Sequence, residues 1–206
     1  MPFNTIIFDL GGVILNLNYD LTVNAFKALG KSNFDTLYAQ SQQDKIFDQF
    51  ETGKISGAAF IAYMKQFLDP SITESEIENA WNAMLLDLPV HRIQLLRELR
   101  KTHKLFLFSN TNEIHLNAFQ KILDQQHGNP ELLETLFDKT YYSHRVGERK
   151  PDAAAFRMVL DEQGLRAEKT LFIDDSLQHI EGASKLGIQT IHLVNSDIRD
   201  LNLTNR

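Results

Sequence analysis

The sequence predicts an α/β protein with a parallel sheet and a block of helices inserted after its first strand. Short apolar runs of strand-forming residues end at small polar or acidic groups, and amphipathic segments separate the later runs. No segment between residues 16 and 85 has the pattern of a strand. Continuously apolar strands are typical of sheets that are covered on both faces, in which helices connect parallel strands.

Four apolar runs are predicted to be strands, because they are rich in strand formers and too short for helices. The run TIIFD ends at Asp9, and KLFLFSNTN becomes polar at Ser109. The run KTLFIDDS becomes polar at Asp174 and Asp175. The run IQTIHLV begins in the same way but has no acidic end, and we expect His192 within it to be structural.

Helices are predicted between and after these strands, where apolar residues recur at helical spacing. Pro151 and Gly164 are typical boundaries for the second of these helices, and Gly187 ends the third. The three segments are HRIQLLRELRKTH, PDAAAFRMVLDEQG and QHIEGASKLG.

The segment from residue 16 to residue 85 is predicted to be a helical cap. Ser56 and Thr73 suit N-cap positions, and Glu76, three residues after Thr73, completes a capping box. We expect Trp81 and the phenylalanines of this segment to be packing residues. The predicted helices are DLTVNAFKALG, DTLYAQSQQDKIFDQFETG, SGAAFIAYMKQFL and TESEIENAWNAML.

Composition narrows the class of protein. The 206 residues are 43% hydrophobic with a net charge of −6, so the chain can bury a core but has no broad basic field for nucleic acid. The absence of cysteine excludes disulfides, thiolate catalysis and cysteine-bound zinc. The first residues lack the basic region and long apolar stretch of a signal peptide, and no apolar run approaches the roughly 20 residues of a membrane span. We expect a cytoplasmic monomer or homodimer without a nucleic-acid or membrane partner.

The polar ends of three strands predict one site, because ligands of open parallel sheets bind outside the carboxyl ends of the strands. Three carboxylates there require compensating positive charge, and oxygen ligands without cysteine suit a hard cation, most naturally Mg²⁺. The set predicts a Mg²⁺-assisted phosphate site in which one carboxylate attacks phosphorus. The gathered residues are Asp9, Ser109, Asn110, Lys150, Asp174 and Asp175.

These motifs resemble the haloacid dehalogenase superfamily, in its phosphatase branch. Asp9 in FDLGGV matches the family's aspartyl nucleophile, and Ser109 matches its phosphate-binding serine or threonine. Lys150 in RKPD matches the motif lysine, and Asp174 and Asp175 match the acids that hold Mg²⁺. Within that branch the chain is similar to sugar-phosphate phosphatases such as the α-glucose-1-phosphatases, and to the phosphatase domain of soluble epoxide hydrolases.

The resemblance implies a fold and an activity over nearly the whole chain. The fold would be a Rossmann-like core of residues 1–15 and 86–206 with a cap domain of residues 16–85. The activity would be hydrolysis of small phosphomonoesters, among them sugar phosphates, through an aspartyl-phosphate on Asp9. The partner would then be a small phosphorylated metabolite.

The resemblance also implies roles for individual residues. Mg²⁺ would be held by Asp9, the main-chain carbonyl of Gly11 and the acidic pair. Asp175 would be the direct ligand of that pair, and Asp174 would act through a water molecule. The phosphate would be bound by Ser109, Asn110 and Lys150, and the catalytic residues would be Asp9 and Lys150.

One position departs from the pattern of the family. Most of its phosphatases carry an aspartate two residues after the nucleophile as general acid and base, where this chain has Gly11. General acid catalysis typically contributes about 10²–10⁴-fold to the rate. Leaving groups of low pKa would therefore be favoured, unless His115, His144 or His179 supplies the proton.

Two other functions remain open. A 2-haloacid dehalogenase of the same superfamily also lacks the second aspartate, but it needs no metal, which leaves the Asp174–Asp175 pair unexplained. A non-catalytic phosphate-binding protein would keep the site and lack turnover.

Overall fold

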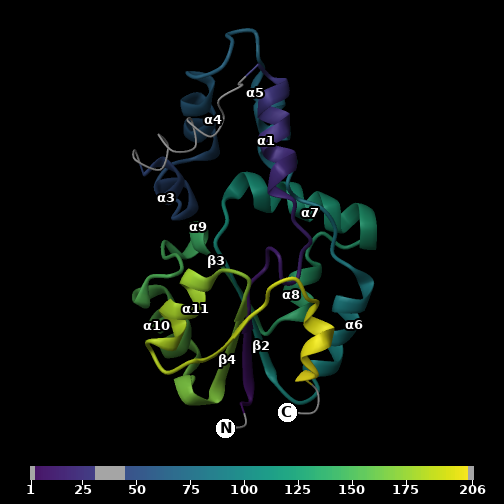
Figure 1. The fold of residues 1–206 in the computed structure, drawn as a ribbon, viewed down its shortest axis with the longest axis vertical. Coiled ribbons are helices and arrows are strands. Elements are labelled where there is room, and N and C mark those ends of the chain that lie inside the picture. Colours follow the sequence, from purple (N-terminus) through teal and green to yellow (C-terminus); the bar gives the residue numbers. More distant parts are fainter. Residues whose placement is uncertain (1–2, 31–44, 204–206) are drawn as a thin grey trace.

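The computed structural model describes residues 3–30 and 45–203 and contains a five-stranded parallel sheet in the order β3-β2-β1-β4-β5 (Figure 1). The α/β prediction is confirmed, and four strands lie in the predicted runs. The edge strand β3 lies in none of them. His192 in β5 has Nε2 3.0 Å from the main-chain oxygen of Asp175, which fits a structural role. The strands are β1 (Thr5–Phe8), β2 (Lys104–Ser109), β3 (Lys139–Tyr142), β4 (Thr170–Asp174) and β5 (Gln189–His192).

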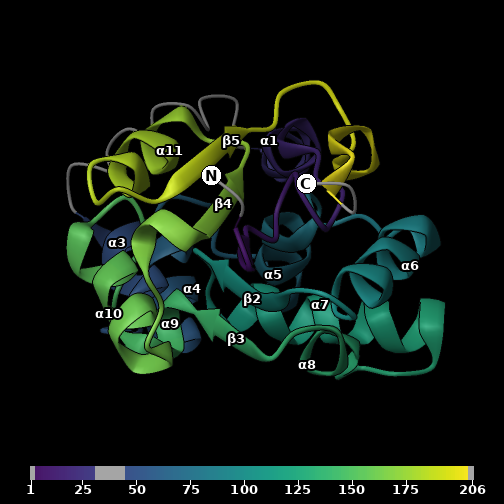
Figure 2. The same ribbon diagram turned by 90° about the horizontal axis from the view of Figure 1, so that it is seen from below.

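Helices cover both faces of the sheet, with α6, α7 and α8 on one side and α10 and α11 on the other (Figure 2). Successive residues of a strand point to opposite faces, so Ile6 and Phe8 belong to one buried cluster and Ile7 to the other. The helices of this part are α6 (Val90–Leu99), α7 (Glu113–His127), α8 (Leu132–Leu136), α9 (Ser143–Val146), α10 (Ala153–Gln163) and α11 (Leu177–Ser184), with 3₁₀ turns η1 (Ala167–Lys169) and η2 (Ile198–Leu201).

The remaining helices stand above the carboxyl ends of the strands (Figure 1). They share a hydrophobic cluster that includes Phe26, Phe50 and Phe60. Ser56 and Thr73 cap helices as predicted, and the capping box at Thr73 is present. Much of the predicted helix DTLYAQSQQDKIFDQFETG lies outside the described residues, and the cap boundaries at residues 16 and 85 stay a prediction. These helices are α1 (Tyr19–Ala28), α3 (Ile46–Glu51), α4 (Gly57–Lys65) and α5 (Glu74–Asn82).

Helix α7, which the sequence patterns did not predict, joins the upper helices to the sheet. Asn112 caps its start by accepting a hydrogen bond from the main-chain N–H of His115. Glu113 accepts a hydrogen bond from the N–H of Gly57 at the start of α4. Ile114 packs into the hydrophobic cluster of the upper helices. The first turn of α7 therefore docks these helices onto the sheet.

Within the described ranges, no helix is long and apolar enough to cross a membrane.

Candidate active site

An acidic cluster lies at the carboxyl ends of β1 and β4. Parallel pairing places Phe8 beside Ile173, so the residues that follow these strands are neighbours. The N–H of Asp9 donates to the carbonyl of Ile173 over 2.9 Å and fixes the chain there. One carboxylate oxygen from each of Asp9, Asp174 and Asp175 lies within 4.8 Å of the others. The structure therefore brings the three predicted acids together.

Lys150 lies beneath this cluster with its side chain fully buried. Its Nζ donates to Asp9 Oδ1 over 2.5 Å and to Asp174 Oδ2 over 2.7 Å. Burial alone would lower the pKa of Lys150, but the two carboxylates outweigh burial and raise it, so the ammonium stays charged. The Asn110 side chain donates to the carbonyl of Lys150 over 2.8 Å and accepts from its N–H over 2.9 Å. The side chain of Asn110 thus positions Lys150.

The oxygens of Asp174 are occupied by protein donors. In addition to the hydrogen bond from Lys150, the Asp174 carboxylate accepts one from the N–H of Ser176 over 2.8 Å. Both of its oxygens lie 3.0 Å from Nδ1 of His179. Burial raises the pKa of Asp174, but Lys150 and His179 outweigh it and hold the pKa below its usual value. A carboxylate has about four lone-pair sites. Little capacity remains on Asp174 for direct metal ligation, which suits a supporting role.

The pKa values of the other two carboxylates are raised. Burial raises the pKa of Asp9 to about 6, with Asp174 and Asp175 adding to the rise and Lys150 opposing it. Burial and the charge of Asp174 also raise the pKa of Asp175. Three carboxylates around one ammonium leave an excess of negative charge that a divalent cation would neutralise. A donor set of oxygens only suits Mg²⁺.

Two glycines shape the turn that follows Asp9. Gly12 has φ +73°, and a Cβ atom there would lie 2.2 Å from Oδ2 of Asp175. Only glycine lets the turn approach that carboxylate so closely in this left-handed conformation. A Cβ atom at Gly11 would lie 2.5 Å from Cδ1 of Leu17. The Leu17 side chain therefore occupies the space next to the position where related phosphatases carry the second aspartate.

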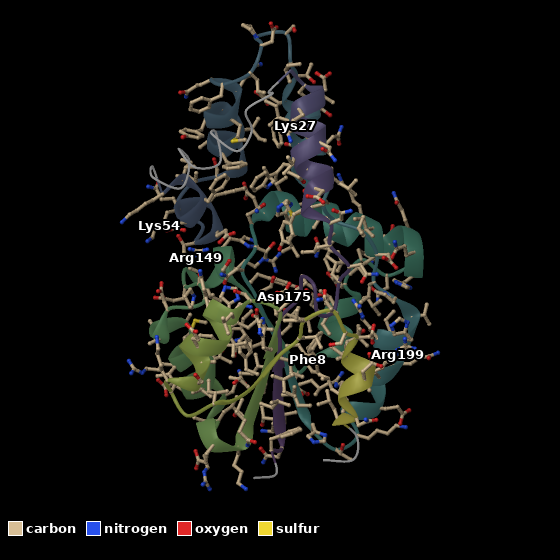
Figure 3. All side chains as sticks on the ribbon, in the orientation of Figure 1. Phe8, Lys27, Lys54, Arg149, Asp175 and Arg199 are labelled. Atoms are coloured by element: carbon tan, nitrogen blue, oxygen red, sulfur yellow. The ribbon has the colours of Figure 1, made fainter. Side chains whose placement is uncertain are left out.

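A crevice of about 850 Å³ opens above the acidic cluster. Figure 3 shows Arg149 and Asp175 between the sheet and the helices above it. Ser109, the last residue of β2, is buried at the crevice wall. Lys150 does not line the crevice and reaches it only through its contact with Asp9. The lining residues that come from the sheet and the segments around it include Asp9, Gly11, Ser109, Asn110, Thr111, His115, Arg149, Asp175 and His179.

Further lining residues come from the helices above the sheet and from the motif that contains Lys150. Trp81 was expected only to pack, but it lines the crevice as well as belonging to the hydrophobic cluster. Glu51 of α3 and Arg149 form an ion pair across the crevice wall, with Oε2 2.8 Å from Nη2. Arg149 could have been predicted as a site residue because it directly precedes Lys150. No pattern in the sequence marks Glu51 as a site residue.

The three histidines named as substitute proton donors occupy different places. His115 lines the crevice, stacks on Trp81 with ring centroids 5.0 Å apart, and has Nδ1 2.8 Å from Oδ1 of Asn82. Burial lowers the pKa of His115 to about 3, so its imidazole is neutral. His144 does not line the crevice, and burial lowers its pKa also. His179 lines the crevice and contacts Asp174.

The chain is similar to known proteins over nearly its whole length. Residues 3–187 match a family model described as haloacid dehalogenase-like hydrolase. The D-ribitol-5-phosphate phosphatase of Bacteroides thetaiotaomicron is 30% identical over 185 residues, which are 90% of this chain and 89% of that protein. The sesquiterpene phosphatase of Aspergillus oryzae is 29% identical over 198 residues, 94% of this chain and 91% of that protein.

A solved structure agrees with the fold. It is a crystal structure of a haloacid dehalogenase family enzyme from Bacteroides thetaiotaomicron in complex with magnesium and inorganic phosphate. Its TM-score is 0.86 at 32% sequence identity, and the match covers 97% of this chain and 99% of that one.

Proposed function

Because the chain belongs to the haloacid dehalogenase-like hydrolases, we propose that it is a Mg²⁺-dependent phosphatase of small phosphomonoesters. The observation that carries this proposal is the cluster of Asp9, Asp174 and Asp175 around the buried ammonium of Lys150, at the floor of a crevice. The phosphatase names of two relatives and the magnesium and phosphate in a similar structure support it.

Asp9 is the proposed nucleophile. Its carboxylate oxygen attacks phosphorus, the bond from phosphorus to the leaving-group oxygen breaks, and the phosphoryl group is carried as an aspartyl-phosphate. Water then attacks this phosphorus, which releases inorganic phosphate and restores the Asp9 carboxylate. Lys150 favours the ionised form of Asp9 and fixes its orientation through the 2.5 Å hydrogen bond.

The remaining site residues have proposed roles in holding ions. Asp9, Asp175 and the carbonyl of Gly11 would hold Mg²⁺, with Asp174 acting through a water molecule because its oxygens already accept protein hydrogen bonds. When bound, Mg²⁺ supplies positive charge to the phosphoryl oxygens. The phosphoryl group would be bound by Ser109 and Asn110, and Lys150, which does not line the crevice, would act on it through Asp9.

The substrate class is proposed from the relatives and remains broad. One relative is named for a polyol phosphate and another for a sesquiterpene, so their leaving groups differ strongly in polarity. The polyol phosphatase is matched at 30% identity over 90% of this chain, which makes sugar and polyol phosphates the first candidates. A cytoplasmic location and a monomeric or homodimeric state stay predictions.

The two alternative functions receive less support. A 2-haloacid dehalogenase would not need the acidic pair Asp174–Asp175, and the named relatives at about 30% identity are phosphatases. A non-catalytic phosphate-binding protein would bind inorganic phosphate without turnover, which a direct assay distinguishes.

The test is a phosphatase assay over a panel of phosphorylated metabolites, with Mg²⁺ and with a chelator. We expect hydrolysis that requires Mg²⁺, and we expect Asp9→Asn to reduce it to background while the protein stays folded. Asp161→Asn, which removes an exposed carboxylate on α10, is the matched control and should keep full activity. Substantial turnover by a folded Asp9→Asn protein, or turnover unaffected by the chelator, would contradict the proposal.

A further inference from the structure

The crevice holds more space than the chemistry of phosphoryl transfer uses. Its volume of about 850 Å³ lies within the range of about 300–1,000 Å³ that is usual for small-molecule sites. The acidic cluster and Ser109 line only the part next to the sheet. If the proposed function holds, the leaving group of the substrate must occupy the remainder, so the groups that line that part decide which leaving groups are accepted.

His115 presents a hydrogen-bond acceptor to this part of the crevice. An amide oxygen can only accept, so the 2.8 Å contact with Oδ1 of Asn82 places the imidazole hydrogen on Nδ1 and a lone pair on Nε2. Within the described parts of the chain, Nε2 has no hydrogen-bond partner. The stack of Phe47 on Trp81 and of Trp81 on His115 holds the ring in place, with centroids 5.6 and 5.0 Å apart.

Glu51 and Arg149 contribute further hydrogen-bonding groups. Arg149 pairs with Asp48 over 2.5 Å and with Glu51 over 2.8 Å, and the side chains of Glu51 and Arg149 are 27% and 28% exposed. Oε2 of Glu51 is taken by this ion pair, and Nε of Arg149, which has no hydrogen-bond partner among the described residues, is itself buried. Both side chains line the crevice, so the Glu51 carboxylate and the Arg149 guanidinium place hydrogen-bond acceptors and donors on one wall.

The charges of this wall cancel. Outside the acidic cluster, the acidic and basic side chains recorded on the crevice lining are Lys45 and Arg149, which are positive, and Asp48 and Glu51, which are negative. Two positive and two negative side chains leave this wall without a net positive charge that would attract a second phosphate or a carboxylate on the leaving group. The wall therefore favours a neutral ligand.

We propose that this part of the crevice is a subsite for an uncharged leaving group with several hydroxyls, and that His115, Glu51 and Arg149 determine specificity for it. A hydroxyl group donates and accepts at once, so adjacent hydroxyls match the acceptor Nε2 of His115, the carboxylate of Glu51 and the guanidinium of Arg149. A leaving group without hydroxyls would leave these polar atoms unpaired, which is unfavourable. An apolar terpenyl group is disfavoured for this reason.

The first test compares substrates of equal length. Ribitol 5-phosphate and n-pentyl phosphate share five carbons and a primary phosphate ester but differ in hydroxyls, and p-nitrophenyl phosphate reports the chemical step without an aliphatic leaving group. The wild-type protein should prefer ribitol 5-phosphate to n-pentyl phosphate in kcat/KM. For His115→Phe and Glu51→Gln, the loss on ribitol 5-phosphate should exceed the loss on p-nitrophenyl phosphate by about tenfold. His103→Phe, on the turn before β2, is the control and should change neither value.

A binding experiment tests the subsite without turnover. Trp81 is the single tryptophan of the chain and lines the crevice, so its fluorescence reports ligands there. Ribitol should change this fluorescence saturably, 1-pentanol should not, and Glu51→Gln should weaken the ribitol response.

The outcomes separate this subsite from the proposed function. If no phosphate ester is hydrolysed with Mg²⁺ but ribitol still binds at Trp81, the phosphatase proposal fails and the subsite stands. If p-nitrophenyl phosphate is hydrolysed but n-pentyl phosphate is used as well as ribitol 5-phosphate, the subsite is wrong. Equal losses on p-nitrophenyl and ribitol phosphates in both variants would also overturn it, since that pattern indicates general damage to the site.

Discussion

Replacing Gly12 by alanine should separate the geometry of the metal site from the stability of the fold. Gly12 has φ +73°, and an added Cβ atom would lie 2.2 Å from Oδ2 of Asp175. Gly128, at the end of α7, has φ +67° with no atom within 4 Å of such a Cβ. The two substitutions impose the same left-handed conformation on alanine, and only the first meets a carboxylate.

The expected magnitudes follow from this difference. Alanine in the left-handed region costs about 1–2 kcal/mol, so both variants should lose about that much free energy of unfolding. A carbon and an oxygen atom seldom approach within about 3.3 Å, so Gly12→Ala must displace the Asp175 carboxylate by about 1 Å. Misplacement of a site group by about 1 Å lowers the rate by about 10²-fold. Mg²⁺ also tolerates little departure from its octahedral geometry.

The assay is kcat/KM over a series of Mg²⁺ concentrations, beside urea unfolding of the same proteins. We expect Gly12→Ala to lose about 10²-fold in kcat/KM and to need more Mg²⁺ for half activity, because Asp175 is displaced. Gly128→Ala should match it in stability and keep wild-type kinetics. Wild-type Mg²⁺ dependence in Gly12→Ala, or an equal loss of activity in Gly128→Ala, would refute the assignment of Asp175 to the metal site.

Three further predictions concern stability, pH and the missing acid. Lys150→Met removes the buried ammonium that pairs with Asp9 and Asp174, and it should lower the free energy of unfolding, measured in urea without metal, by about 3–5 kcal/mol. Lys101→Met, at an exposed pair, should change that free energy by less than about 1 kcal/mol, and equal effects would contradict the burial argument. Although burial raises the pKa of Asp197, hydrogen bonds outweigh burial and hold that pKa low. Asp197→Asn should therefore lower the free energy of unfolding by about 1–3 kcal/mol at neutral pH, and its difference from the wild type should close as pH falls below about 4. A difference that is independent of pH would exclude this carboxylate as its source. A double variant, Gly11→Asp with Leu17→Ala to make room for the new side chain, should flatten the dependence of kcat/KM on leaving-group pKa. An unchanged slope would mean that the new carboxylic acid does not reach the leaving-group oxygen.

The sequence patterns predicted the part of the site that depends on strand ends. Because parallel strands bring their carboxyl ends to one edge, the acids after β1 and β4 had to meet once those strands were neighbours. The resemblance to the haloacid dehalogenase superfamily and the enzyme class are confirmed by the family match. The assignments of individual residues to metal, phosphate and catalysis stay predictions, although the saturated oxygens of Asp174 agree with an indirect role.

The upper wall of the crevice was beyond sequence reasoning, because tertiary contacts create it. Helix α7 has apolar residues at helical spacing and an N-cap at Asn112, so the helix itself was predictable from the sequence, although its docking was not. The pairing of Glu51 with Arg149 joins residues 98 positions apart in the numbering, and no local pattern predicts such a contact. The same holds for His115, whose position against Trp81 and Asn82 depends on how α7 docks below α5.

The structure also limits how the leaving group can be protonated. His115 is neutral because burial lowers its pKa to about 3, and its one imidazole hydrogen is given to Asn82, so it offers the leaving-group oxygen a lone pair and no proton. Leu17 fills the space beside Gly11, so that side of the crevice presents a methyl group where related enzymes present a carboxylate. Both features act in the same direction, since each removes a proton donor from the region above Asp9. A leaving group that bears its own electron-withdrawing hydroxyls departs more readily as an alkoxide than a plain alkyl group does. The polar wall that favours a hydroxylated ligand and the missing general acid therefore select the same class of substrate.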